Sequence, residues 1–271
     1  MKYAPKSSCL ILLFSFFLLQ ACSQELPISK ISGPTMGTEY HISWVTEVSS
    51  ESERSAESID VQSQIDEILR TLNKSMSTYD PESELSLLNT NSPSDWQQIS
   101  EHLFRVLAMS ESIHQRSHGA FDVTVGPLVN LWGFGPNKHL KKVPDVNEVN
   151  ALLANIGAEA IKLREIVSSQ SDGIKKFEVN VASKRYIDLS AIAKGYAVDV
   201  LGEYLEGRGI NRYLVEVGGE ILARGVKAKD TPWRMAIEAP TENTRTAQII
   251  IPLSNLAIAT SGDYRNFFQL I

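Results

Sequence analysis

Residues 212–225, RYLVEVGGEILARG, decide the fold class because they begin a series of short apolar segments. WRMAIEAP (233–240), AQIIIPLS (247–254) and LAIATSG (256–262) follow in quick succession. Segments of this kind, bounded by Gly, Pro and Ser, predict β-strands. Since few helices separate them, we predict an α/β (α+β) fold with mixed, largely antiparallel sheets and packed helices.

The remainder of the chain alternates between the two periodicities. Residues 31–45 predict a loop and then a strand with Tyr40, Ile42 and Trp44 on one face. A polar connection over 46–58 precedes a helix that buries Val61 to Leu72, and Ser100 is the expected N-cap of another that Gly119 ends. Further predicted elements are a short helix (82–89), a helix closed by Gly157, paired strands in 160–167 and 175–181, and a strand that becomes a helix at 188–190.

The N-terminus has the pattern of a signal peptide. Lys2 and Lys6 precede an apolar run too short to span a bilayer. Leu19 to Cys22 then match a lipobox, so we expect a signal peptide over 1–21, a lipid such as palmitate on Cys22, a tether over 22–30 and one domain over 31–271. The alternative is an ordinary signal peptide with an accidental cysteine. The expected location is the periplasmic side of a bacterial membrane.

Composition and motifs exclude several function classes. A hydrophobic content of 43% with 21% charged residues is typical of a globular enzyme, and the formal charge of −6 argues against a nucleic-acid partner. Walker A, GxGxxG and HExxH patterns are absent from the sequence, and the five His residues have no metal-ligand spacing.

The segment YIDLSAIAKGYAVD (186–199) is a candidate phosphate site. It places Asp188 just before a predicted helix and Lys194 within its first two turns. A lysine is disfavoured at a helix N-terminus unless an anion lies nearby. The alternative makes Asp188 and Ser190 helix caps and leaves Lys194 in solvent.

Three other residues suit an aromatic, phosphate-bearing ligand. Asp122 is the single charged residue between His118 and Lys138, so its carboxylate needs a partner in the backbone or in a ligand. Tyr79 is suited to stacking and Met36 to contact with a flat ring, although both could be core residues. In the same stretch as Asp122, GAFDVTVGPLVNLWGFGP (119–136), Trp132 and Phe134 are the expected core anchors.

Six ordered motifs together resemble the ApbE family of FAD:protein FMN transferases, over about Gly33 to Phe268. They are GPTMGTEY (33–40), STYDPESELSLLN (77–89), residues 119–136, IDLSAIAKGYAVD (187–199), YLVEVGGEI (213–221) and AIATSGDYRNFF (257–268). The resemblance implies a T-fold-like domain that transfers the FMN half of FAD to a Thr or Ser hydroxyl of a target flavoprotein, with release of AMP and with Mg²⁺ required. Such targets are subunits of membrane redox complexes, which favours the inner membrane.

The resemblance also implies roles for individual residues. Met36 and Tyr79 would line the flavin pocket, and Ala120, Phe121 and Asp122 would hold FAD through a loop. Asp188 would bind FAD and Lys194 would lie near its phosphates, whereas the backbone carbonyl of Ala191 would be a Mg²⁺ ligand. No catalytic residue is assigned.

The C-terminal motif departs from the family pattern, which continues into a Ser-His and Ile-Asp-Pro segment and then an Asp/Thr segment with side-chain Mg²⁺ ligands. We therefore expect a chain cut short at the C-terminus that holds Mg²⁺ poorly and has little transferase activity. The alternatives are a flavin-binding lipoprotein without transferase activity and a hydrolase that splits FAD into FMN and AMP.

Overall fold

The computed structural model describes residues 26–91, 95–136, 143–167, 175–182, 185–228, 230–239 and 247–262. The expected signal peptide and Cys22 lie outside these residues. Within the described part of the chain, no helix combines the length and the apolar composition needed to cross a membrane.

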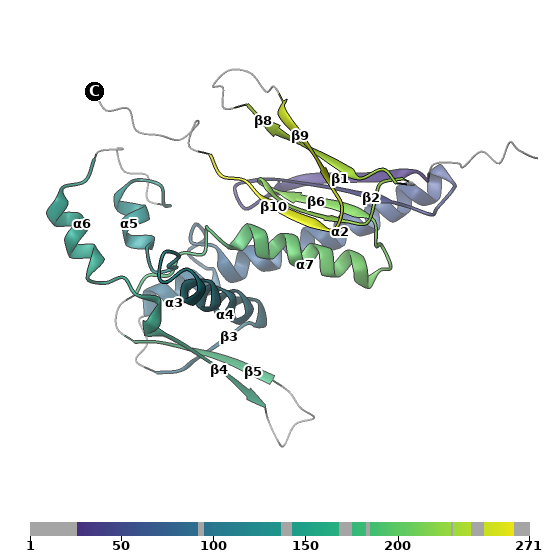
Figure 1. The fold of residues 1–271 in the computed structure, drawn as a ribbon. Coiled ribbons are helices and arrows are strands. Elements are labelled where there is room, and N and C mark those ends of the chain that lie inside the picture. The colour runs from purple at the N-terminus through teal and green to yellow at the C-terminus, as the bar shows by residue number, and fades with distance from the viewer. Residues whose placement is uncertain are drawn as a thin grey trace, which may run out of the picture.

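A five-stranded antiparallel sheet forms the centre of the molecule, in the order β1-β2-β6-β7-β10 (Figure 1). Its strands are β1 (Ile28–Thr35), β2 (Thr38–Val45), β6 (Tyr213–Val217), β7 (Glu220–Arg224) and β10 (Leu256–Ala259). Two-residue turns, Met36-Gly37 and Gly218-Gly219, join β1 to β2 and β6 to β7. All four turn residues have positive φ, as a hairpin turn of this length favours.

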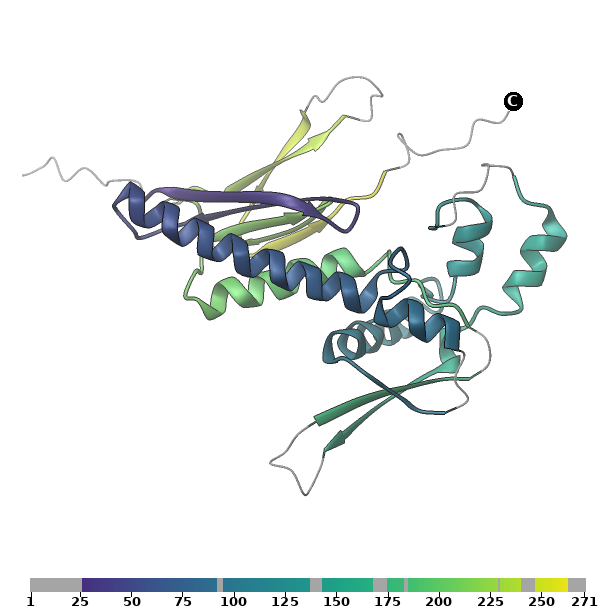
Figure 2. The same cartoon turned by 180° about the vertical axis from the view of Figure 1, so that it is seen from behind.

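Two helices cover one face of this sheet, α2 (Glu51–Met76) and α7 (Ala193–Gly207) (Figures 1 and 2). Alternation along β2 turns Tyr40, Ile42 and Trp44 to this side, and all three are fully buried. The Tyr40 hydroxyl donates to Asp66 Oδ1 of α2 at 2.7 Å, which ties the sheet to the helix. Burial, with a further contribution from Asp66, raises the pKa of Tyr40.

The hairpin of β8 (Trp233–Glu238) and β9 (Ala247–Leu253) lies on the opposite face of the sheet (Figure 1). A small apolar cluster joins the hairpin to the sheet: Val45, Ile221, Ala223, Trp233 and Leu253. The architecture is therefore helices, sheet and hairpin in three layers, as expected for an α+β fold.

A second group of elements lies beside the ends of α2 and α7 (Figure 1). It contains a three-stranded antiparallel sheet in the order β3-β5-β4, with α4 packed against it. Its elements are α3 (Glu84–Asn91), β3 (Gln97–Ile99), α4 (Glu101–Arg116), α5 (Gly126–Leu131), α6 (Val146–Leu153), the 3-10 turn η1 (Ala158–Ala160), β4 (Ile161–Val167) and β5 (Lys175–Val181). Ser100 caps α4 as predicted, since its side chain accepts from the Leu103 amide.

Several expectations were wrong for identifiable reasons. The segment 31–35 is strand and not loop. Pro34 does not interrupt the strand because β1 lies at the sheet edge, where Pro is tolerated. Gly33 leaves room for the Tyr40 ring, which would lie 2.8 Å from a Cβ at this position. The long helix begins at Glu51, capped by Ser50, so the polar connection is shorter than predicted. Residues 185–189 are not strand.

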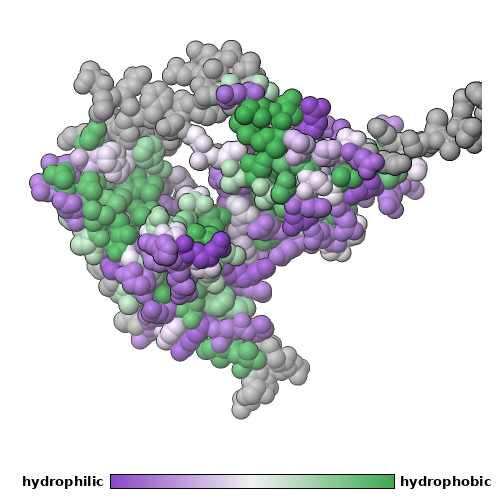
Figure 3. Space-filling view, in the orientation of Figure 1, coloured by the Kyte–Doolittle hydropathy of each residue, from purple (hydrophilic) through white to green (hydrophobic). Residues whose placement is uncertain are grey.

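The stretch 119–136 also differs from the prediction. Residues 126–131 form the short helix α5, and neither Trp132 nor Phe134 is a core residue; the Phe134 side chain is 39% exposed. Apolar residues reach the surface around α5 and α6 (Figure 3).

Candidate functional site

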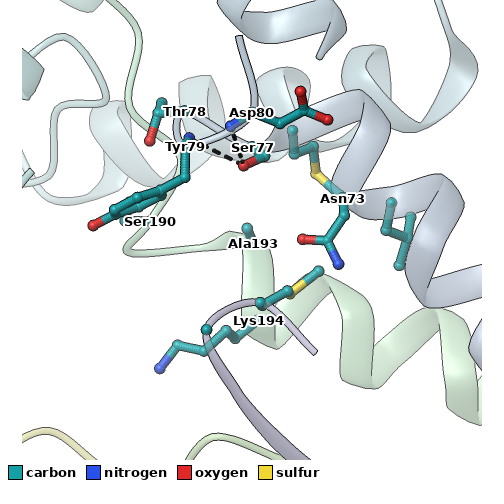
Figure 4. A pocket seen from close by; sticks show the side chains of 12 residues that line it. Asn73, Ser77, Thr78, Tyr79, Asp80, Ser190, Ala193 and Lys194 are labelled. Carbon is teal, nitrogen blue, oxygen red and sulfur yellow. Dashed lines mark hydrogen bonds between the residues drawn. The ribbon is translucent and has the colours of Figure 1, made fainter. Parts of the chain in front are cut away.

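A cavity of about 680 Å³ opens where three distant parts of the sequence meet (Figure 4). Its walls come from the β1–β2 turn, the C-terminal end of α2 with the loop that follows, and the N-terminus of α7. The lining residues are Met36, Gly37, Leu72, Asn73, Met76, residues 77–80, Ser190, Ala193 and Lys194. The cavity thus brings together three of the predicted site residues, Met36, Tyr79 and Lys194.

Met36 lies at the tip of the β1–β2 hairpin. Its backbone φ of 47° is uncommon for a residue other than Gly, Asn or Asp. Met36 adopts this conformation because the two-residue turn requires positive φ. The turn holds Met36 at the cavity wall, where its partly buried side chain also packs against the main core, and a flexible, sulfur-containing side chain suits a flat ligand.

Tyr79 is carried by a loop that its own hydrogen bonds make rigid. The Ser77 hydroxyl accepts from the amides of Tyr79 and Asp80 at 3.1 and 3.2 Å, and the hydroxyls of Ser83 and Ser86 both donate to the Ser77 carbonyl. The Tyr79 side chain is nevertheless 62% exposed, so it is not a core residue. A rigid loop with an exposed aromatic ring is suited to stacking against a ligand.

An ion pair supports the same loop from the α2 side, with Lys74 Nζ 2.9 Å from Asp80 Oδ2. The hydrogen bond from Lys74 lowers the pKa of the Asp80 carboxyl, and the same bond raises the pKa of Lys74. Asp80 is therefore ionised throughout the neutral range.

The N-terminus of α7 lacks a side-chain cap. Its N-cap residue is Ile192, and the Asp188 carboxylate accepts instead from the Ser190 amide at 2.8 Å. The alternative in which Asp188 and Ser190 cap the helix is therefore wrong, because the helix begins several residues later than predicted. The Ala193 amide, the first of α7, donates to the Leu189 carbonyl at 2.8 Å, and the partial positive charge of the helix N-terminus lies beside the cavity.

Lys194, the second residue of α7, lines the cavity (Figure 4). Its Nζ donates to the Gly218 carbonyl at 3.1 Å and lies 3.6 Å from Glu220 Oε1. The β6–β7 turn thereby holds the ammonium group close to the helix N-terminus, so Lys194 is not the fully solvated side chain of the alternative, and its placement near a phosphate stays a prediction.

Asp122 is not among the lining residues of the cavity, and its carboxylate has protein partners. Oδ1 accepts from the amide and hydroxyl of Thr124 at 2.7 and 2.6 Å, and Oδ2 accepts from the Ala158 amide at 3.0 Å. His114 Nδ1 lies 3.6 Å from Oδ2. The first of the two predicted alternatives, a partner in the backbone, is therefore confirmed for this carboxylate, and a contact between the loop and FAD stays a prediction.

The other predicted residues lie close by but outside this cavity. Phe121 packs against the main core, and Ala120 precedes it in the same loop. Asp188 is 7% exposed, next to the cavity residue Ser190. Ala191 lines a neighbouring cavity of about 480 Å³ between α4, α7 and β10. Among the described residues, no group of three or more His, Cys, Asp or Glu side chains could hold a metal.

Sequence reasoning missed Asn73 and Ser190 as site residues. Asn73 stands between Leu72 and Met76, which face the core, but one polar residue on a helix carries no signal of a site. Ser190 was read as a cap. Both enter the site through the packing of α2 and α7.

Comparison with known proteins places these features in a context. The model of the ApbE family matches residues 36–271. The FAD:protein FMN transferase of Vibrio cholerae serotype O1 is 41% identical over 264 residues, which cover 96% of this chain and 73% of that protein. The protein of the same name from Haemophilus influenzae is 39% identical, with 93% and 70% covered.

Solved structures give the same result. The flavin transferase ApbE from Vibrio cholerae superposes with a TM-score of 0.72 at 39% identity, covering 90% of this chain and 74% of that one. The apo form of the Pseudomonas stutzeri flavinyl transferase ApbE gives 0.73 at 30% identity, with 91% and 74% covered.

Proposed function

The chain belongs to the ApbE family, and we propose from this premise that it is an FAD:protein FMN transferase. In this reaction a Thr or Ser hydroxyl of a target flavoprotein attacks the FMN-side phosphorus of FAD. A P–O bond to the hydroxyl oxygen forms, the pyrophosphate P–O bond breaks, and AMP leaves.

The observation that carries the proposal is the arrangement of the cavity walls. At one side Met36 and Tyr79 offer a sulfur and an exposed aromatic ring to a flat ligand, and at another Lys194 and the uncapped N-terminus of α7 offer positive charge. An isoalloxazine ring joined to a pyrophosphate requires both kinds of wall. Lys194 and the helix amides would stabilise the charge on the phosphoryl group during transfer.

Mg²⁺ dependence is part of the proposal and rests on the family resemblance. The metal would supply charge neutralisation at the pyrophosphate. The described residues do not make a complete site for it, since the Ala191 carbonyl is one oxygen and Mg²⁺ prefers octahedral oxygen ligands. No step is therefore assigned to the metal.

We also propose that residues 1–21 are removed, that Cys22 carries the lipid, and that the domain faces the periplasm from the inner membrane. The support is the N-terminal sequence pattern. The proposed partners are flavoprotein subunits of membrane redox complexes. A Cys22→Ala variant should leave the membrane fraction, whereas a Cys9→Ala variant should stay in it.

The transferase proposal is tested with the full-length protein, FAD, Mg²⁺ and a candidate target subunit. We expect a fluorescent flavin band at the mass of the target on a denaturing gel, and its loss when EDTA is added or the acceptor Thr is changed to Val. Release of FMN and AMP without a band would indicate a hydrolase, and bound, unchanged FAD would indicate a flavin carrier. Either result would refute the proposal.

A further inference from the structure

The side-chain amide of Asn73 has a defined orientation in the cavity wall. Its Nδ2 donates to the Leu69 carbonyl at 3.1 Å and to Thr35 Oγ1 at 3.4 Å. Because a backbone carbonyl can accept but never donate, the amino group must face Leu69, and the oxygen must face away from it. The Asn73 side chain points into the cavity between α2 and α7 (Figure 4).

No described residue donates a hydrogen bond to the Asn73 oxygen. The neighbouring wall is apolar, since Leu72 is fully buried and Met76 is 4% exposed. A ligand that fills this part of the cavity removes water from the oxygen, and an acceptor left without a donor there weakens binding. The wall therefore selects a ligand with a donor at this position.

The position of Asn73 indicates which part of FAD lies against it. The Thr35 hydroxyl accepts from the Asn73 amino group, and Thr35 directly precedes Met36, the residue suited to the flat ring. The positive charge of the cavity comes from α7 and not from α2. Asn73 is thus part of the wall that faces the ring system.

We propose that Asn73 Oδ1 accepts the N3–H of the isoalloxazine ring, which makes Asn73 a recognition residue for the flavin. The oxidised ring has a single N–H donor, N3, between two carbonyl groups. The pyrimidine edge of the ring would then face α2 and the β1–β2 turn. This inference rests on FAD as the substrate of the proposed function.

The test is a double comparison of protein and ligand. Dissociation constants are measured for FAD and 3-methyl-FAD with the wild-type protein and with Asn73→Ala, without Mg²⁺ or target. We expect the wild type to bind FAD about tenfold more tightly than 3-methyl-FAD, since the methyl group removes a hydrogen bond and leaves the Asn73 oxygen without a donor. In Asn73→Ala the ratio should fall below about twofold.

Asn211→Ala is the matched control. The Asn211 amide also donates to a backbone carbonyl, Gly209 O at 3.0 Å, but Asn211 lies outside the cavity. This variant should keep the tenfold ratio. FMN and 3-methyl-FMN should show the same pattern, because they keep N3 and lack adenine.

Equal ratios in the wild type and Asn73→Ala would overturn the inference, as would equal affinities of the wild type for FMN and 3-methyl-FMN, which differ at the same N3. Because each protein serves as its own reference, a loss of stability in Asn73→Ala does not imitate the expected result. Discrimination by Asn73 in a protein that transfers no FMN would refute the proposed function and leave this inference standing.

Discussion

Replacing Asp122 by Asn distinguishes a ligand contact from a structural role for this carboxylate. Asn keeps one carbonyl oxygen, which can still accept from the Thr124 amide and hydroxyl. Its amino group must then face the Ala158 amide, which now donates to Oδ2 at 3.0 Å. Two donors face each other there, and a nearly buried amide loses its partner.

The expected cost follows from these contacts. Loss of a hydrogen bond to a charged group, with its buried donor left unsatisfied, costs about 1.5–3 kcal/mol. One such bond is lost and two others become neutral, so the free energy of unfolding should fall by about 2–3 kcal/mol. With a urea m-value of about 3 kcal/mol/M, the midpoint should fall by about 0.7–1 M.

The assay is urea unfolding together with FAD binding under native conditions. Asp145→Asn is the control, because Asp145 caps α6 from the surface and Asn caps helices as well as Asp does. Its midpoint should move by less than about 0.2 M. We expect the FAD affinity of Asp122→Asn to stay within about threefold of the wild type. An unchanged midpoint with a tenfold loss of FAD affinity would refute the reasoning and assign the carboxylate to the ligand.

Three further predictions concern the cavity walls and the β6–β7 turn that holds Lys194. Tyr79→Ala should weaken FAD binding about tenfold through lost stacking. Tyr79→Phe should keep the affinity within about twofold, since the hydroxyl makes one long hydrogen bond, 3.4 Å to the Phe134 carbonyl. Equal losses of affinity in the two variants, measured by flavin fluorescence, would contradict a stacking role. Gly218→Ala should lower the free energy of unfolding by about 2 kcal/mol, because Gly218 has a φ of +54° and the new Cβ would lie 2.6 Å from Thr38 Cγ2. Gly207→Ala is the control, since no atom lies near the new Cβ, and it should lower the free energy of unfolding by less than about 0.5 kcal/mol. The lowered pKa of Asp80 means that its pair with Lys74 contributes fully above the ordinary value of 3.8 and is lost as pH falls through the lowered value. The difference in melting temperature between the wild type and Asp80→Asn should therefore be constant from about pH 5 to about pH 8 and shrink as the pH falls below 3.8. A change centred near neutrality would show that another group titrates.

The parts of the fold that follow from local periodicity could be predicted from the sequence. Tyr40, Ile42 and Trp44 alternate along a strand, and Val61 to Leu72 repeat at helical spacing, so each pattern shows which face meets the core. The Ser100 cap and the turn at Asp80 depend on residues within a few positions of each other. The family resemblance likewise rests on short motifs and their order.

Interactions between distant residues could not be predicted in this way. Pro34 is tolerated because β1 lies at a sheet edge, and that position depends on the pairing of β2 with β6. The Asp122 carboxylate accepts a hydrogen bond from the distant Ala158 amide. The start of α7, beyond Ser190, depends on how the preceding segment packs. The periodicity of one segment carries no information about the partner that another segment supplies.

The sequence by itself thus determined the secondary structure pattern, the family and the identity of Met36, Tyr79 and Lys194 as candidate ligand residues. Tertiary structure alone decided that these three share a cavity, that Asp122 is occupied by protein donors, and that the Asn73 oxygen faces the cavity. The physical reason is that side-chain chemistry belongs to a single residue, whereas the direction and partners of a polar group are set by backbone atoms that the fold brings from elsewhere in the chain.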